Sequence, residues 1–416
     1  AFGAVSTRIG LPPLVGYLVA GFVLNSFGVA GGDILARISD AGVTLLLFTI
    51  GLKLKLKTLA RPEVWAGATG HMLITTALFF GGLTIAGALG AAHFQFSRWQ
   101  TAALIAFALS FSSTVFAVKV FDEKKELSSR HADTAIGILI MQDIIAVVFL
   151  TASAGTIPSP WALVLAATLL AVRPLLLRLM AQCGHGELLM LFGILMTAGG
   201  YNSFELVGLK GDLGALVFCW LRASHPKASE LADRLLSFKD LFLVGFFLNI
   251  GISGSLTVAS LVAALGLTLV MPIKSVLFFL LLTRFKLRAR TALLVSLSLS
   301  NYSEFGLIVG AIGMYSGWLD KEWLTIIAIA LSITFILAAP LNTDAHNIYM
   351  CISPRLKRFE HPERLAEERP IDVGDTRILI FGMGHVGENA YDALQEKYGQ
   401  DVTGVDFDER TVASHR

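Results

Sequence analysis

The chain has 416 residues, of which 55% are hydrophobic and only 15% are charged, and its mean hydropathy is +0.69. Soluble domains carry about 25% charged residues, so this composition excludes an ordinary soluble globular protein and predicts a membrane protein. The net charge of +2 says little by itself, and it gives no reason to expect a nucleic-acid partner.

A helix needs roughly 20 apolar residues to cross a bilayer, and runs of this kind recur along most of the chain. The first residues, AFGAVSTRIG, have the pattern of the end of a helix, so we expect the chain to lack its true beginning. Twelve further candidate spans predict thirteen membrane helices in all. They lie near residues 12–29, 38–54, 64–92, 99–121, 134–155, 160–181, 187–204, 206–222, 238–253, 257–283, 291–316 and 322–345.

Lysine and arginine are concentrated in every second loop, which is the pattern of cytoplasmic loops. Examples are the basic clusters within residues 53–61, 119–130 and 284–290. The intervening loops carry only Arg37, Arg98, Lys210 and Lys321. With thirteen spans, this alternation predicts an N-terminus outside the cell and a cytoplasmic location for everything after about residue 350.

The span at 134–155 carries two polar side chains near its middle, Gln142 and Asp143, within ILIMQDIIAVVFL. A carboxylate at the bilayer centre costs about 2.5–3.5 kcal/mol on insertion scales. Such an acid normally faces the protein interior or a water-filled cavity, and it marks a path for ions or protons. The alternative is a structural acid that is hydrogen-bonded to a neighbouring helix. We interpret Asp143 as the residue that binds the ion or the proton.

Two further segments place polar side chains inside apolar spans. These side chains are Ser110, Ser112, Ser113 and Thr114 in LSFSSTVFAV, and Ser298, Ser300, Asn301, Ser303 and Glu304 in SLSLSNYSEFG. Small and hydroxyl side chains satisfy backbone groups that a local break in a helix sets free. Two interrupted helices in corresponding positions of two halves point to the ion site of an inverted-repeat transporter. The alternative is that these side chains serve helix packing.

Lys274, in VMPIKSVLFF, is the other charge deep in a span, and Pro272 is expected to loosen the turn before it. We expect this lysine either to neutralise carbonyl groups at broken helix ends or to pair with a buried acid. The alternative is a lysine that extends its amine to the membrane interface. Glu304 is expected to belong either to the ion site or to its frame, and His71 is expected to be a packing residue.

The last part of the chain changes character. Residues 350–375 are charged and contain three prolines, which predicts a cytoplasmic linker after a transmembrane domain at 1–349. Residues 376–416 begin with a short apolar strand and a loop that is followed by a helix, a second strand and an acid. The loop has the spacing G-x-G-x-x-G and consists of Gly382, Met383, Gly384, His385, Val386 and Gly387.

In such a loop the backbone approaches a phosphate closely, and a helix N-terminus faces the anion. Asp406 lies 19 residues after Gly387, where an acid holds ribose hydroxyls. Because an acid favours a free ribose over a 2′-phosphate, we expect NAD(H) or AMP in preference to NADP(H). The alternative is a Rossmann-like unit that uses its glycines only for packing and oligomerisation. The chain ends after one β-α-β piece, so we expect a truncated domain.

These motifs together resemble a known family. The segments SFSSTVFAVKVF, HADTAIGILIMQDIIAVVFL, PIKSVLFFLLL, NYSEFGLIVGAIG and RILIFGMGHVGENA, in this order, are similar to the monovalent cation:proton antiporter-2 family, and within it to the Kef-type potassium/proton antiporters. The resemblance covers essentially the whole chain. It implies an α-helical thirteen-helix antiporter fold with inverted repeats, and two broken helices that cross in a core domain beside a dimer domain.

The resemblance also implies functional roles. Asp143 would be the ion-binding aspartate, and the C-terminal part would be the start of a regulatory nucleotide-binding domain of the RCK/KTN type. A homodimer in the bacterial inner membrane is implied, and control by glutathione or an ancillary subunit is an open possibility. Electrogenic sodium/proton relatives have two adjacent aspartates where this chain has Gln142–Asp143, which favours electroneutral exchange. The family lysine pairs with the first of these acids, so the role of Lys274 stays open.

We therefore expect a secondary transporter, and not an enzyme, that exchanges potassium for a proton at Asp143. Ser112, Ser113, Thr114, Gln142 and backbone carbonyls of the broken helix would supply further oxygens. Sodium in place of potassium is the main alternative. A nucleotide-gated potassium channel would want a filter like TVGYG, which the sequence lacks. A membrane dehydrogenase is suggested only by the glycine motif.

Overall fold

The structure is a computed structural model of the 416-residue chain. It describes residues 2–8, 13–29, 31–35, 37–39, 56–91, 94–96, 98–127, 129–153, 161–184, 186–207, 214, 218, 227, 230–231, 235, 244–252, 254, 256–365, 368–369 and 376–406. The expected spans at 38–54 and 206–222 lie almost wholly outside these residues. The count of thirteen membrane helices therefore stays a prediction.

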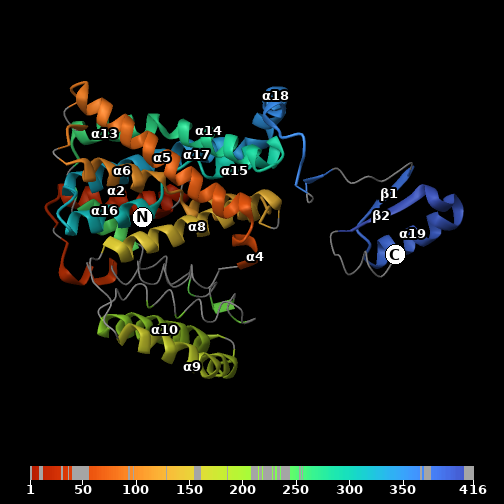
Figure 1. The fold of residues 1–416 in the computed structure, drawn as a ribbon, viewed down its shortest axis with the longest axis horizontal. Helices are drawn as coiled ribbons and strands as arrows, with labels where there is room; N and C mark the ends of the chain where they lie inside the picture. The colour runs from red at the N-terminus through yellow and green to blue at the C-terminus, as the bar shows by residue number, and fades with distance from the viewer. Residues whose placement is uncertain are drawn as a thin grey trace. The chain divides into compact units, whose positions relative to one another are not determined.

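The chain forms two compact units, Ala1–Glu363 and Arg364–Arg416. The first unit is helical (Figure 1). Its described helices are α1 (Phe2–Arg8), α2 (Pro13–Ser26), α4 (Leu56–Leu59), α5 (Pro62–Ala88), α6 (Trp99–Ser110), α7 (Thr114–Glu123), α8 (Arg130–Ser153), α9 (Trp161–Gln182), α10 (Glu187–Leu206), α13 (Val258–Leu269), α14 (Met271–Arg284), α15 (Ala289–Ser298), α16 (Glu304–Tyr315), α17 (Lys321–Thr343) and α18 (Ala345–Leu356), followed by a 3-10 turn at Lys357–Phe359.

Several of these helices have the length and apolar composition of membrane spans. Within the described part of the chain, four stretches meet both criteria: Pro62–Ala88, Trp99–Asp122, Val258–Arg284 and Lys321–Thr343. Helix α5 packs against α6, α8 and α14, and α16 packs against α6 and α17 (Figure 1). The helical unit therefore has the character of a polytopic membrane protein.

Two of the spans are broken, as the sequence predicts. Helix α6 ends at Ser110, the backbone is extended at Phe111 (φ −72°, ψ 150°), and α7 begins at Thr114. Helix α15 ends at Ser298, and α16 begins at Glu304. Each new helix begins with a serine that caps it, because the hydroxyl of Ser113 accepts from the N–H of Phe116 and that of Ser303 accepts from the N–H of Phe305.

The helix before the first break, α6, and the helix after the second break, α16, approach each other closely. A Cβ atom on Gly306 would lie 2.4 Å from the carbonyl oxygen of Ala108, so the backbones of α16 and α6 touch at this point. Glycine is the residue that permits such close packing of membrane helices. Aromatic and aliphatic side chains around the crossing, including Ile105, Phe111 and Phe305, are fully buried in one hydrophobic cluster.

The expected span at 257–283 is confirmed as the stretch Val258–Arg284, which is long and apolar enough to cross a membrane. An interruption at Val270 divides this span into two helices, α13 and α14. Pro272 lies in the first turn of α14, where its missing N–H is no loss because that turn has no intrahelical acceptor. The division places Lys274 in the first turn of a new helix.

The second unit contains one β-α-β element. Strand β1 (Ile378–Phe381) and strand β2 (Val402–Val405) are parallel, with Ile378 opposite Val402, and helix α19 (His385–Tyr398) connects them. The turn after β1 is held by a hydrogen bond from the N–H of Gly382 to the carbonyl of Val405, at 2.8 Å. The strand, loop, helix and second strand occur in the order that the sequence predicts.

Candidate ion site at the crossing of two broken helices

Asp143 lies in α8 beside the first break. Its side chain is almost completely buried, with 1% of the residue exposed. The hydroxyl of Thr114 donates to Asp143 Oδ2 at 3.4 Å, which is a long hydrogen bond. Because Thr114 is the first residue of α7, the carboxylate lies close to the positive end of a helix dipole. This position stabilises a negative charge that is otherwise costly so deep in the protein.

Gln142, the neighbour of Asp143, is fully buried and binds the backbone of the break. Its Oε1 accepts from the N–H of Ser112 at 2.9 Å. Its Nε2 has no hydrogen-bond partner among the described residues. The side-chain oxygen that the sequence assigns to the cation therefore already holds a backbone N–H that the broken helix leaves free.

The two breaks are tied directly to each other. The hydroxyl of Ser112 donates to the carbonyl of Leu299 at 3.0 Å. The N–H of Ser113 donates to Asn301 Oδ1 at 2.7 Å, and Asn301 Nδ2 in turn donates to the carbonyl of Ser298 at 3.0 Å. Polar backbone groups that no helix satisfies are thus paired across the crossing, as a buried site requires.

Lys274 joins both breaks from a third helix. The residue is completely buried, which excludes a lysine that extends to the membrane interface. Its Nζ donates to the carbonyl oxygens of Phe111, at 2.5 Å, and of Asn301, at 2.9 Å. These carbonyls belong to broken helix ends, which carry partial negative charge. These contacts match one of the two roles that the sequence leaves open, the neutralisation of carbonyl groups, and the role itself stays a prediction.

Glu304 is the first residue of α16 and is also completely buried. The hydroxyl of Ser303 lies 3.5 Å from its Oε2. The side chain stands at a helix N-terminus, where a negative charge is favoured. The two breaks thus have matching electrostatics, because an acid lies near the start of the helix that follows each of them. This acid is Asp143 of α8 beside α7, and Glu304 within α16.

Three further residues support this arrangement, and only one of them was considered in the sequence. Tyr302 donates its hydroxyl to the carbonyl of Leu267 at 2.6 Å, and its ring lies 5.5 Å from Lys274 Nζ. The N–H of Tyr302 donates to the hydroxyl of Thr334. His71 stacks on Phe278 and places Nε2 3.1 Å from the carbonyl of Lys274, so it packs behind the lysine. The signal for Tyr302 was its place within SNYSEFG.

In the second unit, the glycine loop has the features that a bound phosphate needs. Gly382 has φ +88°, which favours glycine, and a Cβ on Gly387 would lie 1.8 Å from the Gly382 carbonyl oxygen. A Cβ on Gly384 would meet no atom of the described residues within 4 Å, and helix α19 begins directly after it at His385. Val386 is 84% exposed.

Asp406 faces the same loop. Its Oδ2 accepts from the N–H of Met383 at 2.5 Å. The acid at the end of β2 and the backbone of the glycine loop are therefore adjacent, as they are in a site for a nucleotide. The residues present fit an anionic group held by the loop and a ribose held by the acid.

The chain belongs to the sodium/hydrogen exchanger family, because the transmembrane model of that family matches residues 1–343. The family is one of cation/proton exchangers, which are transporters. The resemblance to Kef-type antiporters that the motifs indicate is confirmed by similarity to curated proteins of that type.

Two of these relatives are glutathione-regulated potassium-efflux system proteins KefC. The chain is 29% identical over 413 residues to the protein of Salmonella schwarzengrund, and 28% identical over 415 residues to that of Salmonella arizonae. Each match covers 93% of this chain and 63% of the relative. The chain therefore spans less than two thirds of the length of these relatives.

Among solved structures, the chain is similar to the sodium proton antiporter MjNhaP1 from Methanocaldococcus jannaschii at pH 8. The TM-score is 0.56 with 14% sequence identity, and the match covers 84% of this chain and 94% of the other. At this identity the similarity concerns the fold alone. It supports a helical membrane antiporter fold for the first unit.

Proposed function

We propose that this protein exchanges potassium for a proton across the membrane, and that Asp143 carries both in turn. The observation that carries this proposal is the buried carboxylate of Asp143 beside the start of α7, at the crossing of two broken helices. The names of the Salmonella relatives favour potassium. Sodium is the alternative, because the similar fold of MjNhaP1 belongs to a sodium proton antiporter.

The mechanism is competition for one carboxylate. Burial favours the neutral form of an acid, whereas a bound cation favours the charged form. Asp143 therefore holds a proton or a dehydrated cation, and seldom both. Thr114 and backbone carbonyls of the break are the nearby oxygen donors, and carbonyl dipoles replace the hydration water of an alkali ion. Exchange is obligatory if only the loaded, neutral carboxylate crosses between the two sides of the membrane.

Gln142 makes the exchange electroneutral in this proposal. Only one titratable acid lies at this point of α8, so one cation is exchanged for one proton. The carbonyl-bound Lys274 keeps the charge of the crossing balanced without taking part in proton exchange. Movement of the two broken helices against the rest of the bundle would then alternate access.

The test is cation-driven proton flux in proteoliposomes with potassium or sodium. Asp143→Asn is expected to abolish exchange, because the amide neither titrates nor carries charge. The matched control is Asp133→Asn in the same helix, where the side chain is 39% exposed and pairs with Arg61; this variant is expected to retain exchange. Retained pH-dependent potassium flux in Asp143→Asn would refute the proposal, and current without proton coupling would favour a channel.

We further propose that the C-terminal unit binds NAD(H) or AMP and regulates this exchange. A nucleotide at this loop is supported by Gly384, the helix that starts at His385 and the acid Asp406. The homodimer, the inner-membrane location, the cytoplasmic side of this unit and control by glutathione or an ancillary subunit belong to the same proposal. Titration of the purified chain with NADH, AMP and NADPH tests it, and equal binding of NADPH would contradict the role given to Asp406.

A further inference from the structure

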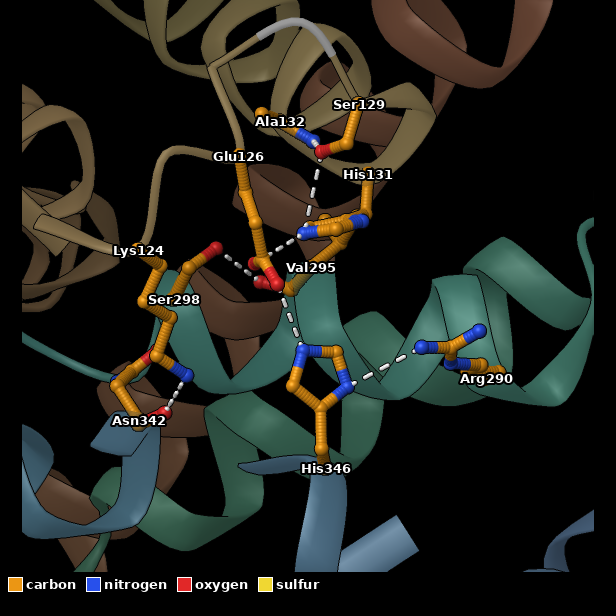
Figure 2. Close-up of polar contacts among 10 residues, drawn as sticks. All are labelled: Lys124, Glu126, Ser129, His131, Ala132, Arg290, Val295, Ser298, Asn342 and His346. Atoms are coloured by element: carbon orange, nitrogen blue, oxygen red, sulfur yellow. Dashed lines mark hydrogen bonds and ion pairs between the residues drawn. The ribbon is translucent and has the colours of Figure 1, made fainter. Parts of the chain in front are cut away.

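A cluster of titratable side chains lies away from the ion site, where the loop after α7 meets α8, α15 and α18 (Figure 2). Glu126, in that loop, is at its centre. Its Oε2 lies 2.9 Å from Nε2 of His131 in α8, and its Oε1 lies 2.8 Å from Nε2 of His346 in α18. On the other side of the His346 ring, Nδ1 lies 3.4 Å from Nη2 of Arg290 in α15.

The hydrogen-bond partners determine the charge of His346. Arginine donates and never accepts, so the 3.4 Å contact with Arg290 is a hydrogen bond only in the tautomer in which Nδ1 of His346 accepts and Nε2 donates to Glu126. In that tautomer the imidazole is neutral. Addition of a proton at Nδ1 removes the acceptor and places a positive charge against the guanidinium of Arg290. The same proton strengthens the contact with Glu126, because a neutral hydrogen bond becomes charge-assisted.

The partners of His131 do not require one of its ring nitrogens to accept and the other to donate. Its Nε2 faces Glu126 and the hydroxyl of Ser129, at 3.2 Å, and a hydroxyl either donates or accepts. The ring of His131 lies 6.5 Å from that of His346, so a charge on one opposes a charge on the other. Lys124, a further charged residue beside the cluster, donates its amine to the carbonyl of Asn342. His346 is therefore the member whose protonation breaks a contact.

Glu126 supplies a constant negative charge. Burial raises the pKa of its carboxyl, but the hydrogen bonds from His346 and His131 outweigh burial and hold the pKa below the ordinary value of 4.5. An acid whose pKa is lowered stays ionised above that value. Glu126 therefore carries its negative charge near neutral pH.

The cluster contacts the helices that lead to the ion site. Helix α15 runs from Arg290 to the second break, α8 carries Asp143, and α7 runs from the first break to the loop of Glu126. Asn342, at the end of α17, donates to the carbonyl of Leu297 near the end of α15, at 2.8 Å. The cluster and the crossing are therefore connected through shared helices.

We propose that His346 is a proton-sensitive contact between α18 and α15, and that its protonation releases Arg290 and changes the rate of exchange. This regulatory role rests on the proposed exchange activity. It is separate from the titration of Asp143, because the cluster and the ion site share no residue. The ligand that is sensed is the proton on the side of the membrane that carries the loop of Glu126.

The transport test uses everted membrane vesicles, in which that side faces the bath. Proton efflux driven by potassium is measured at about pH 6 and about pH 8, on either side of the ordinary histidine pKa of about 6.5. His346→Gln keeps one donor and one acceptor but does not titrate. The ratio of the rate at about pH 6 to the rate at about pH 8 is therefore expected to differ from the wild-type ratio by on the order of threefold. His346→Lys, with a fixed charge, is expected to give the low-pH behaviour at both values.

The control is His361→Gln, a histidine outside the cluster whose hydrogen bonds within the described part of the chain are to the backbone of Glu363. It is expected to keep the wild-type ratio. An unchanged ratio in His346→Gln would overturn the proposal. If the wild-type protein exchanges no cation at any pH, the proposed function fails, and the structural part is decided by hydrogen exchange.

For that measurement, amide exchange of the purified chain is followed by mass spectrometry at the same two pH values and corrected for the chemical pH dependence of exchange. Protection at the start of α15, around Arg290, is expected to fall at the lower pH in the wild type and to stay constant in His346→Gln. Equal pH dependence in both proteins would overturn the proposal without reference to transport.

Discussion

At the scale of single residues, Lys274 is the best example of a buried charge whose partners are backbone groups. Its amine binds carbonyl oxygens of Phe111 and Asn301, on both breaks. Lys274→Met leaves these carbonyls without a donor, and each buried unsatisfied group costs about 1–3 kcal/mol. We expect a clear fall in melting temperature in detergent and a loss of exchange. Lys286→Met, at a side chain that is 42% exposed, is the control and should change stability by less than about 0.5 kcal/mol. A Lys274→Met protein as stable as the wild type would contradict the assigned role.

The sequence predicts the members of the ion site better than their contacts. Asp143, Gln142 and Lys274 stand out because polar groups are expensive in apolar spans. The carbonyl partners of Lys274 carry no such signal, since any residue has a carbonyl. The contact between Glu126 and His346 joins residues 220 positions apart, and neither lies in an apolar run. Only the packing of the helices brings such residues together.

At the scale of elements, two ion pairs tie the start of α8 to the start of α5. Arg130 binds Glu63 at 2.7 Å, where the Glu63 side chain is only 6% exposed, and Arg61 binds Asp133 at 2.6 Å in a more exposed position. Glu63→Gln leaves a guanidinium without its buried carboxylate, so we expect it to destabilise the protein by about 1–3 kcal/mol. Asp133→Asn removes an exposed pair and should cost at most about 1 kcal/mol. Thermal unfolding of both variants checks this order, and an equal loss in both would contradict it.

Sequence patterns predict the end of a helix well where the side chains at that point themselves determine it. The breaks after Ser110 and Ser298 are predictable because serine caps the helix that follows and satisfies backbone groups. The division of α13 from α14 is hidden inside a continuous apolar run, since Pro272 is tolerated in a first turn and gives only a weak boundary signal. Hydropathy therefore predicts the span itself, but not the interruption at Val270 within it.

At the scale of the whole molecule, the short segment after α18 is part of the helical unit. Glu360 Oε1 accepts from the N–H of Ala289 at 2.8 Å and so caps the start of α15, the helix that leads to the second break. Such a cap contributes about 1 kcal/mol. The nearby pair of Lys286 with Glu363 is exposed and contributes little. The end of the helical unit therefore stabilises the frame of the ion site through one carboxylate.

Two truncated chains test this dependence. A chain that ends after Glu363 keeps the cap, so we expect it to fold, to retain exchange and to lose any response to nucleotide. A chain that ends after Leu356 loses the cap together with the exposed pair, so its melting temperature should be lower and its exchange slower. Glu360→Gln in the full chain separates the two contributions, because an amide oxygen still accepts from Ala289 but carries no charge for the helix dipole. Identical melting temperatures for the two truncated chains would show that α15 needs no support from this segment.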